Sequence, residues 1–179
     1  MTITPEQRDD PRRDPTKVTE DPLSRESALL EGGCSCGAVR YRLESAPMFV
    51  HCCHCLNCQK HTGTAFVINM LIETTRVELV RGELTEIDMP LNGGSPNKIF
   101  RCSKCLVAVW SEYGRPQFRF VRAGTLDDPK AVSPDVHIYT RSKLPWVTLP
   151  ASVPQFAAYY DPMKVWPAAS LERRKAALG

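Results

Sequence analysis

The amino-acid sequence predicts a mainly β fold that is built around clustered cysteines. Short segments of apolar and β-prone residues are separated by glycine, proline and asparagine, which is typical of strands joined by turns. The chain has 8 cysteines, and each of them lies within three residues of another, next to such a segment. Helices are expected only as one short turn after a cysteine cluster and as one segment at the C-terminal end.

The chain is expected to form one domain with an extension at each end. A length of 179 residues fits a single domain. Residues 1–28 are rich in proline and charged residues and poor in large apolar ones, so they are predicted to be a disordered tail. Residues 29–165 are expected to form the ordered domain, which is large enough to bury its own core. Residues 166–179 are expected to be a C-terminal tail or short helix.

The composition argues against several classes of protein. The net charge is +3, with both signs mixed along the chain, which indicates neither a nucleic-acid partner nor a membrane surface. No apolar run approaches the ~20 residues that cross a bilayer. The N-terminal residues include no apolar segment, so a secretory signal is not expected. We therefore expect a cytoplasmic protein whose cysteines bind metal. A disulfide framework or a redox role for the cysteine pairs is the weaker alternative.

The first predicted elements surround the first two cysteine clusters. Residues 38–44 alternate between apolar and charged side chains, which indicates a half-buried strand. Residues 48–53 are expected to form a second strand. Residues 57–62 are compatible with a short helical turn that ends at Gly63, a natural C-terminal stop.

Further strands are expected in the middle of the chain. Residues 65–72 are apolar enough for a buried strand, and residues 76–80 and 84–89 are expected to form a hairpin. A loop is expected at residues 92–97. The last strands are expected at residues 98–101, 106–111 and 118–123, the first two joined by a turn that carries two cysteines.

The segment after Gly124 is punctuated by prolines, which suit neither long helices nor central strands. Its aromatic rings are expected mostly to pack against the body of the domain. Residues 170–178 are expected to form a terminal helix capped by Ser170.

Three cysteines are spaced C-x-C-x-x-C, and we call Cys53, Cys55 and Cys58 the three-cysteine cluster. The first two project to the same side of an extended backbone, and the third returns to that side if the chain bends into a short helix. Three converging thiolates can hold a soft tetrahedral metal, for which zinc is the default. Three ligands leave one coordination position open, as in catalytic zinc sites.

Two further pairs complete a second set of ligands, which we call the four-cysteine cluster: Cys34, Cys36, Cys102 and Cys105. Four sulfur ligands leave no position for water, which is typical of structural zinc sites. The glycines beside Cys34 and Cys36 permit the tight backbone of a zinc knuckle. The sequence therefore predicts two zinc ions per chain with different roles.

Cys52 is left over from both clusters. It points away from Cys53 in an extended segment, so we expect a buried, small apolar residue rather than a ligand. His51, His54 and His61 remain candidates for a fourth ligand of the three-cysteine cluster.

Taken together, these residues resemble the glutathione-dependent formaldehyde-activating enzyme and centromere protein V family. The resemblance spans residues 32–146, and it departs from the family at Leu106, where glycine is usual. The family pattern is carried by residues 33–37, 53–60 and 102–105, with support from residues 123–129, 137–138 and 145–146.

The resemblance implies a zinc-containing β fold of two packed antiparallel sheets with zinc knuckles and short helices. It implies a structural zinc on the four-cysteine cluster and a catalytic zinc on the three-cysteine cluster. It also implies an activity classed as a carbon-sulfur lyase, in which glutathione and formaldehyde form S-(hydroxymethyl)glutathione. A small thiol such as glutathione would be the partner, and a homo-oligomer is compatible with the family. The candidates to bind the glutathione carboxylates are Lys60, Arg101, Arg141 and Lys143.

Two other functions compete with this enzyme. The first is a non-catalytic, zinc-braced module that binds a protein, because a fold does not dictate a function. That alternative is favoured if His51 or His54 closes the open position. Nucleic-acid binding ranks last, because the basic residues are spread along the chain rather than gathered around a metal.

Overall fold

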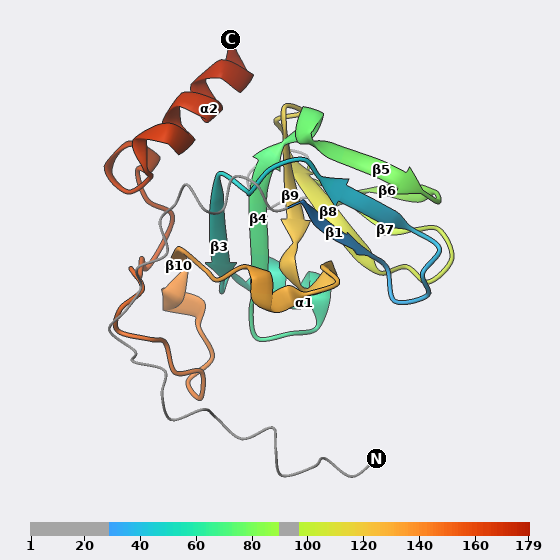
Figure 1. The fold of residues 1–179 in the computed structure, drawn as a ribbon. Coiled ribbons are helices and arrows are strands. Elements are labelled where there is room, and N and C mark those ends of the chain that lie inside the picture. The colour runs from blue at the N-terminus through green and yellow to red at the C-terminus, as the bar shows by residue number, and fades with distance from the viewer. Residues whose placement is uncertain (1–28, 90–96) are drawn as a thin grey trace, which may run out of the picture.

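The protein is described by a computed structural model that covers residues 29–89 and 97–179. Within these residues the strands form a three-stranded sheet and a seven-stranded sheet (Figure 1). The mainly β class and the two sheets predicted from the sequence are confirmed. The predicted tail at residues 1–28 and nearly all of the predicted loop at 92–97 lie outside the described residues.

The small sheet has the order β1-β2-β5 and the large sheet has the order β10-β3-β4-β9-β8-β7-β6. Ten strands are described: β1 (Leu30–Gly33), β2 (Arg40–Leu43), β3 (Phe49–Cys53), β4 (Val67–Glu73), β5 (Val77–Arg81), β6 (Leu84–Met89), β7 (Asn97–Cys102), β8 (Ala108–Tyr113), β9 (Phe118–Arg122) and β10 (Val136–Ile138). The helices of the described chain are α1 (Leu56–Thr62) and α2 (Ala168–Leu178), with short 3-10 turns η3 (Thr74–Arg76), η4 (Ala123–Thr125), η5 (Pro129–Ala131), η6 (Thr140–Ser142) and η7 (Pro162–Lys164). Neither α-helix combines the length and apolarity needed to cross a bilayer.

The proline-rich segment contributes one short strand, β10, to the edge of the large sheet. It pairs with β3 in parallel, and the other strand pairs of the described chain are antiparallel. An edge position suits this segment, because prolines interrupt the hydrogen-bonding ladder of a central strand.

The hairpin predicted from residues 76–80 and 84–89 is wrong, although both strands exist. β5 pairs with β2 in the small sheet, whereas β6 pairs with β7 in the large sheet. Between them, Gly82 has a φ of +92° and lies so close to the Ala38 carbonyl that a Cβ would meet its oxygen at 2.3 Å. The chain therefore crosses from one sheet to the other at this glycine instead of folding back on itself.

The main core lies between the two sheets. Alternate residues of β2, namely Val39 beside its start and Tyr41 and Leu43 within it, are at most 1% exposed. They pack with residues of the large sheet such as Met70. The ring of Tyr41 meets the edge of Trp110 across the core, with centroids 5.9 Å apart. The alternation that predicted a half-buried strand is thus confirmed.

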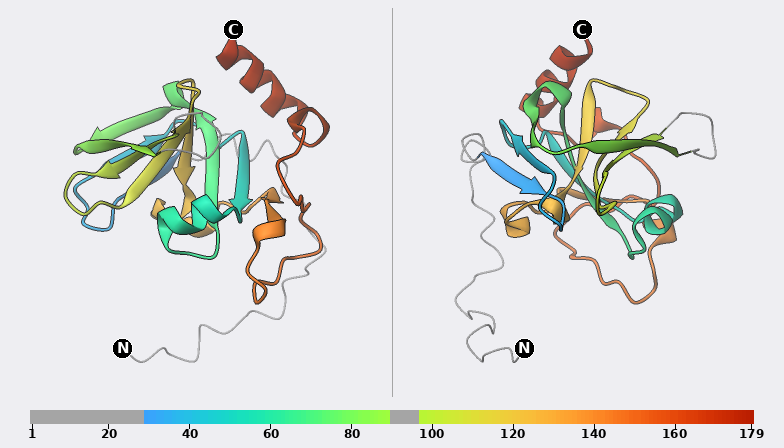
Figure 2. Two further views of the ribbon diagram at one scale, coloured as in Figure 1. Left: turned by 180° about the vertical axis from the view of Figure 1, so that it is seen from behind. Right: turned by 90° about the vertical axis from the view of Figure 1, so that its right-hand side faces the viewer.

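The C-terminal helix α2 docks beside the start of β3 and the end of β4, and it rises from that end of the sheet (Figure 2). The predicted cap is wrong, because the helix starts at Ala168 after Pro167. Ser170 lies inside the helix and donates its hydroxyl to the Met48 carbonyl at 2.6 Å. Proline fixes a φ suitable for a helix start, which explains why the helix begins earlier than expected.

Candidate active site and metal centres

The three-cysteine cluster forms where β3 ends and α1 begins (Figure 1). The three sulfur atoms all lie within 4.8 Å of one another. Cys55 caps α1, and its sulfur accepts a hydrogen bond from the Cys58 N–H at 3.3 Å. Gly63 ends the helix in the left-handed conformation, as the sequence predicts. Cys55 is partly exposed while Cys53 and Cys58 are buried, so solvent reaches the cluster on the side of Cys55.

The three sulfurs do not ionise independently. Hydrogen bonds from Cys53 and then from Cys58 lower the pKa of Cys55 to about 2. The same hydrogen bond to Cys55 raises the pKa of Cys53, and burial adds to this. The cluster by itself therefore favours one thiolate stabilised by two thiols. Ionising all three sulfurs requires positive charge beside them, which a bound cation supplies.

A buried arginine shares the sheet face of the three-cysteine cluster. Cys53 and His51 lie on one face of β3, and the strand register places Asn69 and then Arg122 in line with His51. Arg122 is 6% exposed, and it donates a hydrogen bond to the Asn69 side chain. Its Nε has no partner, and its charge pairs with no carboxylate of the described residues. Its positive charge acts on the Cys58 thiol, so it favours a thiolate in the cluster.

Three tyrosines lie within electrostatic range of the same cluster. Tyr139, Tyr159 and Tyr113 each feel the charge of its sulfurs. Burial raises the pKa of all three phenols, and that of Tyr113 to about 12. Their hydroxyls therefore stay protonated and can donate hydrogen bonds. Tyr139 takes a left-handed backbone conformation, with a φ of +56°, just before η6.

Sequence reasoning missed Arg122 and Tyr113 and treated the other two rings as packing. One signal for Arg122 was available in the sequence. Phe118, Phe120 and Arg122 alternate along β9, so an arginine stands on the apolar side of a predicted strand. No such signal marks Tyr113, because a tyrosine at the end of a strand is ordinary.

The four basic residues proposed for carboxylate binding divide into two kinds. Arg101 donates to the carbonyls of Leu106 and His61, and the Lys143 ammonium donates to two backbone carbonyls at 3.2 and 2.6 Å. These two cations are thus occupied in holding loops. Lys60 and Arg141 are exposed, and they lie on α1 and η6.

The four-cysteine cluster brings two knuckles together, as the spacing predicts. Its four sulfurs lie within 4.8 Å of one another, with Cys34 and Cys36 sulfurs 3.4 Å apart. The second knuckle joins β7 to β8. Leu106 closes this turn, because its N–H donates to the Cys102 carbonyl at 2.9 Å. The φ angle of Leu106 is +61°. This left-handed position explains why a glycine would suit the turn, and leucine there is strained.

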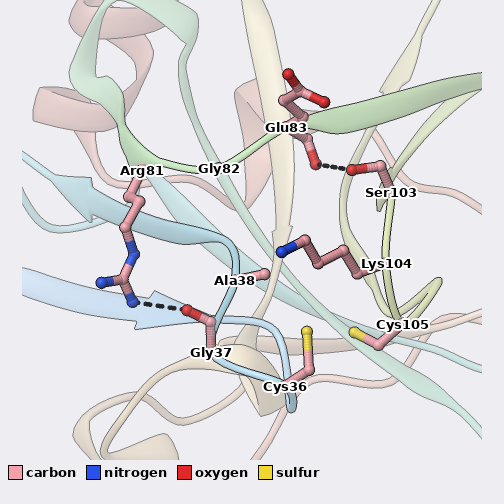
Figure 3. A pocket seen from close by; sticks show the side chains of 9 residues that line it. All are labelled: Cys36, Gly37, Ala38, Arg81, Gly82, Glu83, Ser103, Lys104 and Cys105. Atoms are coloured by element: carbon pink, nitrogen blue, oxygen red, sulfur yellow. Dashed lines mark hydrogen bonds between the residues drawn. The ribbon is translucent and has the colours of Figure 1, made fainter.

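A surface hollow of about 690 Å³ lies beside the four-cysteine cluster (Figure 3). Cys36 and Cys105 line it from below, and Lys104 extends into it. On the opposite side Arg81 donates to the Gly37 carbonyl at 2.7 Å. No residue of the three-cysteine cluster lines this hollow. A set of four sulfurs has no position for a reactant, so we place the candidate active site at the three-cysteine cluster and not here.

The histidines do not join the three-cysteine cluster. His51 bonds the Tyr160 hydroxyl at 2.9 Å. The charge of Cys55 acts on His61, but the His61 ring is not among the ligand atoms that converge with the three sulfurs. His54 turns to the other face of β3, where its Nε2 lies 3.1 Å from Nδ1 of His137 and 3.6 Å from the sulfur of Cys52. The three-cysteine group of the described chain thus contains sulfur ligands alone. Cys52 is buried and faces away from Cys53, as predicted.

The chain is similar to known proteins over most of its described domain. Residues 29–142 match the family model described as glutathione-dependent formaldehyde-activating enzyme. A relative from Halomonas elongata, described as "Putative glutathione-dependent formaldehyde-activating enzyme", is 32% identical over 141 residues, which are 74% of this chain and 90% of the relative. A crystal structure of a Rhodobacter sphaeroides protein aligns with 58% of this chain and 91% of its own, at 22% identity and a TM-score of 0.44. By its family match and by its identity to the Halomonas relative, the chain belongs to the glutathione-dependent formaldehyde-activating enzyme family.

Proposed function

We propose that the protein adds the thiol of glutathione to formaldehyde, and reverses this addition, at the three-cysteine cluster. In the forward direction the glutathione sulfur forms a bond to the formaldehyde carbon, and the thiol proton ends on the oxygen to give S-(hydroxymethyl)glutathione. The reverse direction breaks the same carbon-sulfur bond, as a lyase does. The observation that carries the proposal is the convergence of Cys53, Cys55 and Cys58 in a member of this family.

The donor set fits zinc at both clusters. Cys53, Cys55 and Cys58 would hold a catalytic ion, and the four-cysteine cluster would hold a structural one. With three protein ligands, zinc keeps a position at which it can bind a thiol as thiolate or polarise a carbonyl oxygen. We favour thiolate binding, because three thiolates already donate charge and blunt the acidity of the ion.

Arg122 would balance the charge of a bound thiolate. A divalent ion with three thiolates carries a net charge of −1, and a fourth thiolate makes it −2. A buried excess of negative charge is costly unless it is paired. The Arg122 guanidinium is always charged, is nearly fully buried, and lacks a carboxylate partner among the described residues. It is therefore suited to hold the glutathione sulfur as an anion beside the cluster.

The oxygen of formaldehyde needs a proton or a hydrogen bond as the carbon-sulfur bond forms. The field of all three cluster sulfurs reaches the Tyr139 hydroxyl, and its burial keeps the phenol protonated. Tyr139 is therefore our candidate to donate a hydrogen bond to that oxygen. Tyr113 and Tyr159 would shield the site from water.

The glutathione carboxylates would be received at the exposed rim between α1 and η6. Gln59 joins these elements, since its side-chain amide donates to the Ser142 carbonyl at 2.9 Å. Lys60 follows Gln59 in the sequence, and Arg141 precedes Ser142. They are exposed, and unlike those of Arg101 and Lys143 their side chains make no hydrogen bond to a backbone carbonyl among the described residues.

The experiment compares the Cys55→Ala variant with the wild-type protein. Formaldehyde and glutathione combine without a catalyst, so the rate is read as magnetisation exchange between free and adduct glutathione by NMR at equilibrium. We expect the wild type to accelerate the exchange and Cys55→Ala to lose that acceleration together with one zinc per chain in native mass spectrometry. Lys104→Ala, in the hollow of Figure 3, is the matched surface control. If Cys55→Ala keeps the wild-type exchange rate, the proposed function is wrong.

A further inference from the structure

A third cluster of metal-binding side chains lies on the opposite face of β3 from the three-cysteine cluster. It consists of Cys52, His54 and His137, whose ligand atoms all lie within 4.8 Å of one another. The three residues are 2%, 0% and 7% exposed. Neither the spacing of the sequence nor the proposed reaction gives this cluster a role.

The backbone explains why these residues meet. In the run Cys52-Cys53-His54-Cys55, alternate residues face opposite sides of an extended chain. Cys53 and Cys55 therefore belong to one cluster, and Cys52 and His54 face away from it. The parallel pairing of β10 with β3 places His137 directly beside Cys52. One short segment thus supplies ligands to both faces of the sheet, and β10 completes the second set.

Two neighbouring ligand atoms lie close to one nitrogen of His54. The Nε2 atom of His54 lies 3.6 Å from the sulfur of Cys52 and 3.1 Å from Nδ1 of His137. A ring nitrogen carries either one proton or one lone pair, so Nε2 forms one directed hydrogen bond and cannot satisfy both neighbours. A cation between the three atoms accepts a lone pair from each of them at once.

The spacing of the atoms suits a tetrahedral ion. Bonds of about 2.05 Å to nitrogen and 2.3 Å to sulfur place two nitrogens about 3.3 Å apart and a nitrogen and a sulfur about 3.6 Å apart. The observed separations are 3.1 and 3.6 Å. These two separations differ from the ideal ones by at most a few tenths of an ångström, and the third, between the Cys52 sulfur and the ligand nitrogen of His137, is below 4.8 Å.

We propose that Cys52, His54 and His137 form a third metal site, which takes zinc or a divalent ion of similar ligand preference. One thiolate and two imidazoles are a donor set that zinc accepts readily. This site is separate from the proposed reaction, and it stands or falls independently of it.

The surroundings of the cluster are compatible with this role. All three side chains are buried, and metal binding would displace the proton of the Cys52 thiol. Besides His137, the charged group that acts on His54 is Lys143, whose ammonium is held by the carbonyls of Leu144 and Val147. His54 Nδ1 has no partner among the described residues, and the Phe66 ring packs against this imidazole.

The site would tie the proline-rich segment to the sheet. β10 has three residues, and it pairs with β3 on one side and forms only an isolated bridge, His137 with Gln155, on the other. An ion shared by His137 on β10 and by two residues of the β3 segment would fasten this edge. It would also hold β3 from the face opposite Cys53.

The test counts zinc per chain by native mass spectrometry in the wild type and in two variants, Cys52→Ala and His137→Ala, after dialysis against zinc-free buffer. We expect each variant to carry one ion fewer than the wild type. Ile138→Val, a mild change at the neighbouring buried position of β10, should keep the wild-type count. Equal counts in the wild type and the two variants would overturn the proposal and leave a hydrogen-bonded cluster.

A second measurement needs no variant and covers the case in which a substitution unfolds the chain. X-ray absorption at the zinc edge of the wild type should show imidazole scattering in addition to sulfur, because His54 and His137 would be ligands. The other two clusters supply only sulfur among the described residues. A spectrum with sulfur but no imidazole ligands contradicts the third site, while it leaves the three-cysteine cluster and the proposed function intact.

Discussion

At the scale of single residues, the chemistry depends on which side chains the folded chain brings beside the cysteines. The cysteine spacings were enough to predict both sulfur clusters, because ligands at short spacing are brought together by local turns. Arg122 was not predicted, since its place beside Cys58 depends on the pairing of β9 with β4. The Cys52 cluster was missed for the same reason, because His137 arrives from a distant segment.

Arg122→Met should separate stability from activity. Removing a buried charge without a carboxylate partner favours folding, whereas the buried Asn69 oxygen loses its donor at a cost of about 1–3 kcal/mol, so the free energy of unfolding should change by less than about 2 kcal/mol. The same change should slow glutathione-dependent exchange by roughly 10- to 100-fold, since a charge-assisted interaction of about 1.5–3 kcal/mol is lost. NMR exchange and urea unfolding check the two effects. Arg122→Lys should recover part of the rate; a variant that loses stability and activity together would indicate a structural role instead.

Leu106→Gly should stabilise the second knuckle. The left-handed conformation costs a residue with a Cβ roughly 1–2 kcal/mol, and glycine would relieve this strain. Part of the relief is offset, because glycine has more conformational entropy in the unfolded chain. We expect a net increase of about 0.5–1 kcal/mol in the free energy of unfolding. Leu106→Ala keeps the strain and is the matched control. Chemical denaturation of the zinc-loaded protein measures both variants, and equal stability of the two would contradict the strain.

At the scale of elements, strand positions were easier to predict than strand partners. Alternating apolar residues marked β2 and β9 correctly, because the period of two is a local property. The partners of β5 and β6 could not be read from the same pattern. A hairpin was the natural expectation for two strands joined by a glycine turn, but Gly82 packs against Ala38 and passes the chain to the other sheet.

One of the contacts that dock α2 is a buried ion pair that should be sensitive to acid. Glu73 is 8% exposed in its side chain, and Arg173 bonds both of its oxygens at 2.8 and 2.6 Å. Burial alone would raise the pKa of Glu73, but the hydrogen bonds of Arg173 lower it below the ordinary value of 4.5. A lowered pKa in the folded state stabilises the protein above pH 4.5, and this stabilisation disappears as pH falls through the folded value.

Arg173→Ala should therefore destabilise the protein by about 2 kcal/mol at neutral pH, because the buried Glu73 carboxylate then keeps only the more exposed Arg76 as a partner. Below pH 4.5 the difference from the wild type should shrink, since the carboxyl is then protonated in the variant and increasingly in the wild type. Unfolding curves between pH 3 and pH 7 measure this. Arg174→Ala, the next position on the helix, is the control, and a difference that stays constant with pH would contradict the ion pair.

At the scale of the whole molecule, the two sheets position one strand-to-helix turn so that its sulfurs meet a buried cation and three phenols. Composition and spacing predicted the fold class and the sulfur ligands, since both follow from local pattern. The surroundings of the cluster come from four strands or turns that are distant in sequence, so they required the structure.

The most direct measurement of the central claim is a crystal structure of the zinc-loaded protein with glutathione. We predict that the glutathione sulfur lies next to the sulfurs of Cys53, Cys55 and Cys58 around one zinc ion, with Arg122 beside it. Glutathione seated instead in the hollow beside Cys36 and Cys105, or the cluster cysteines joined to one another as disulfides, would contradict the account.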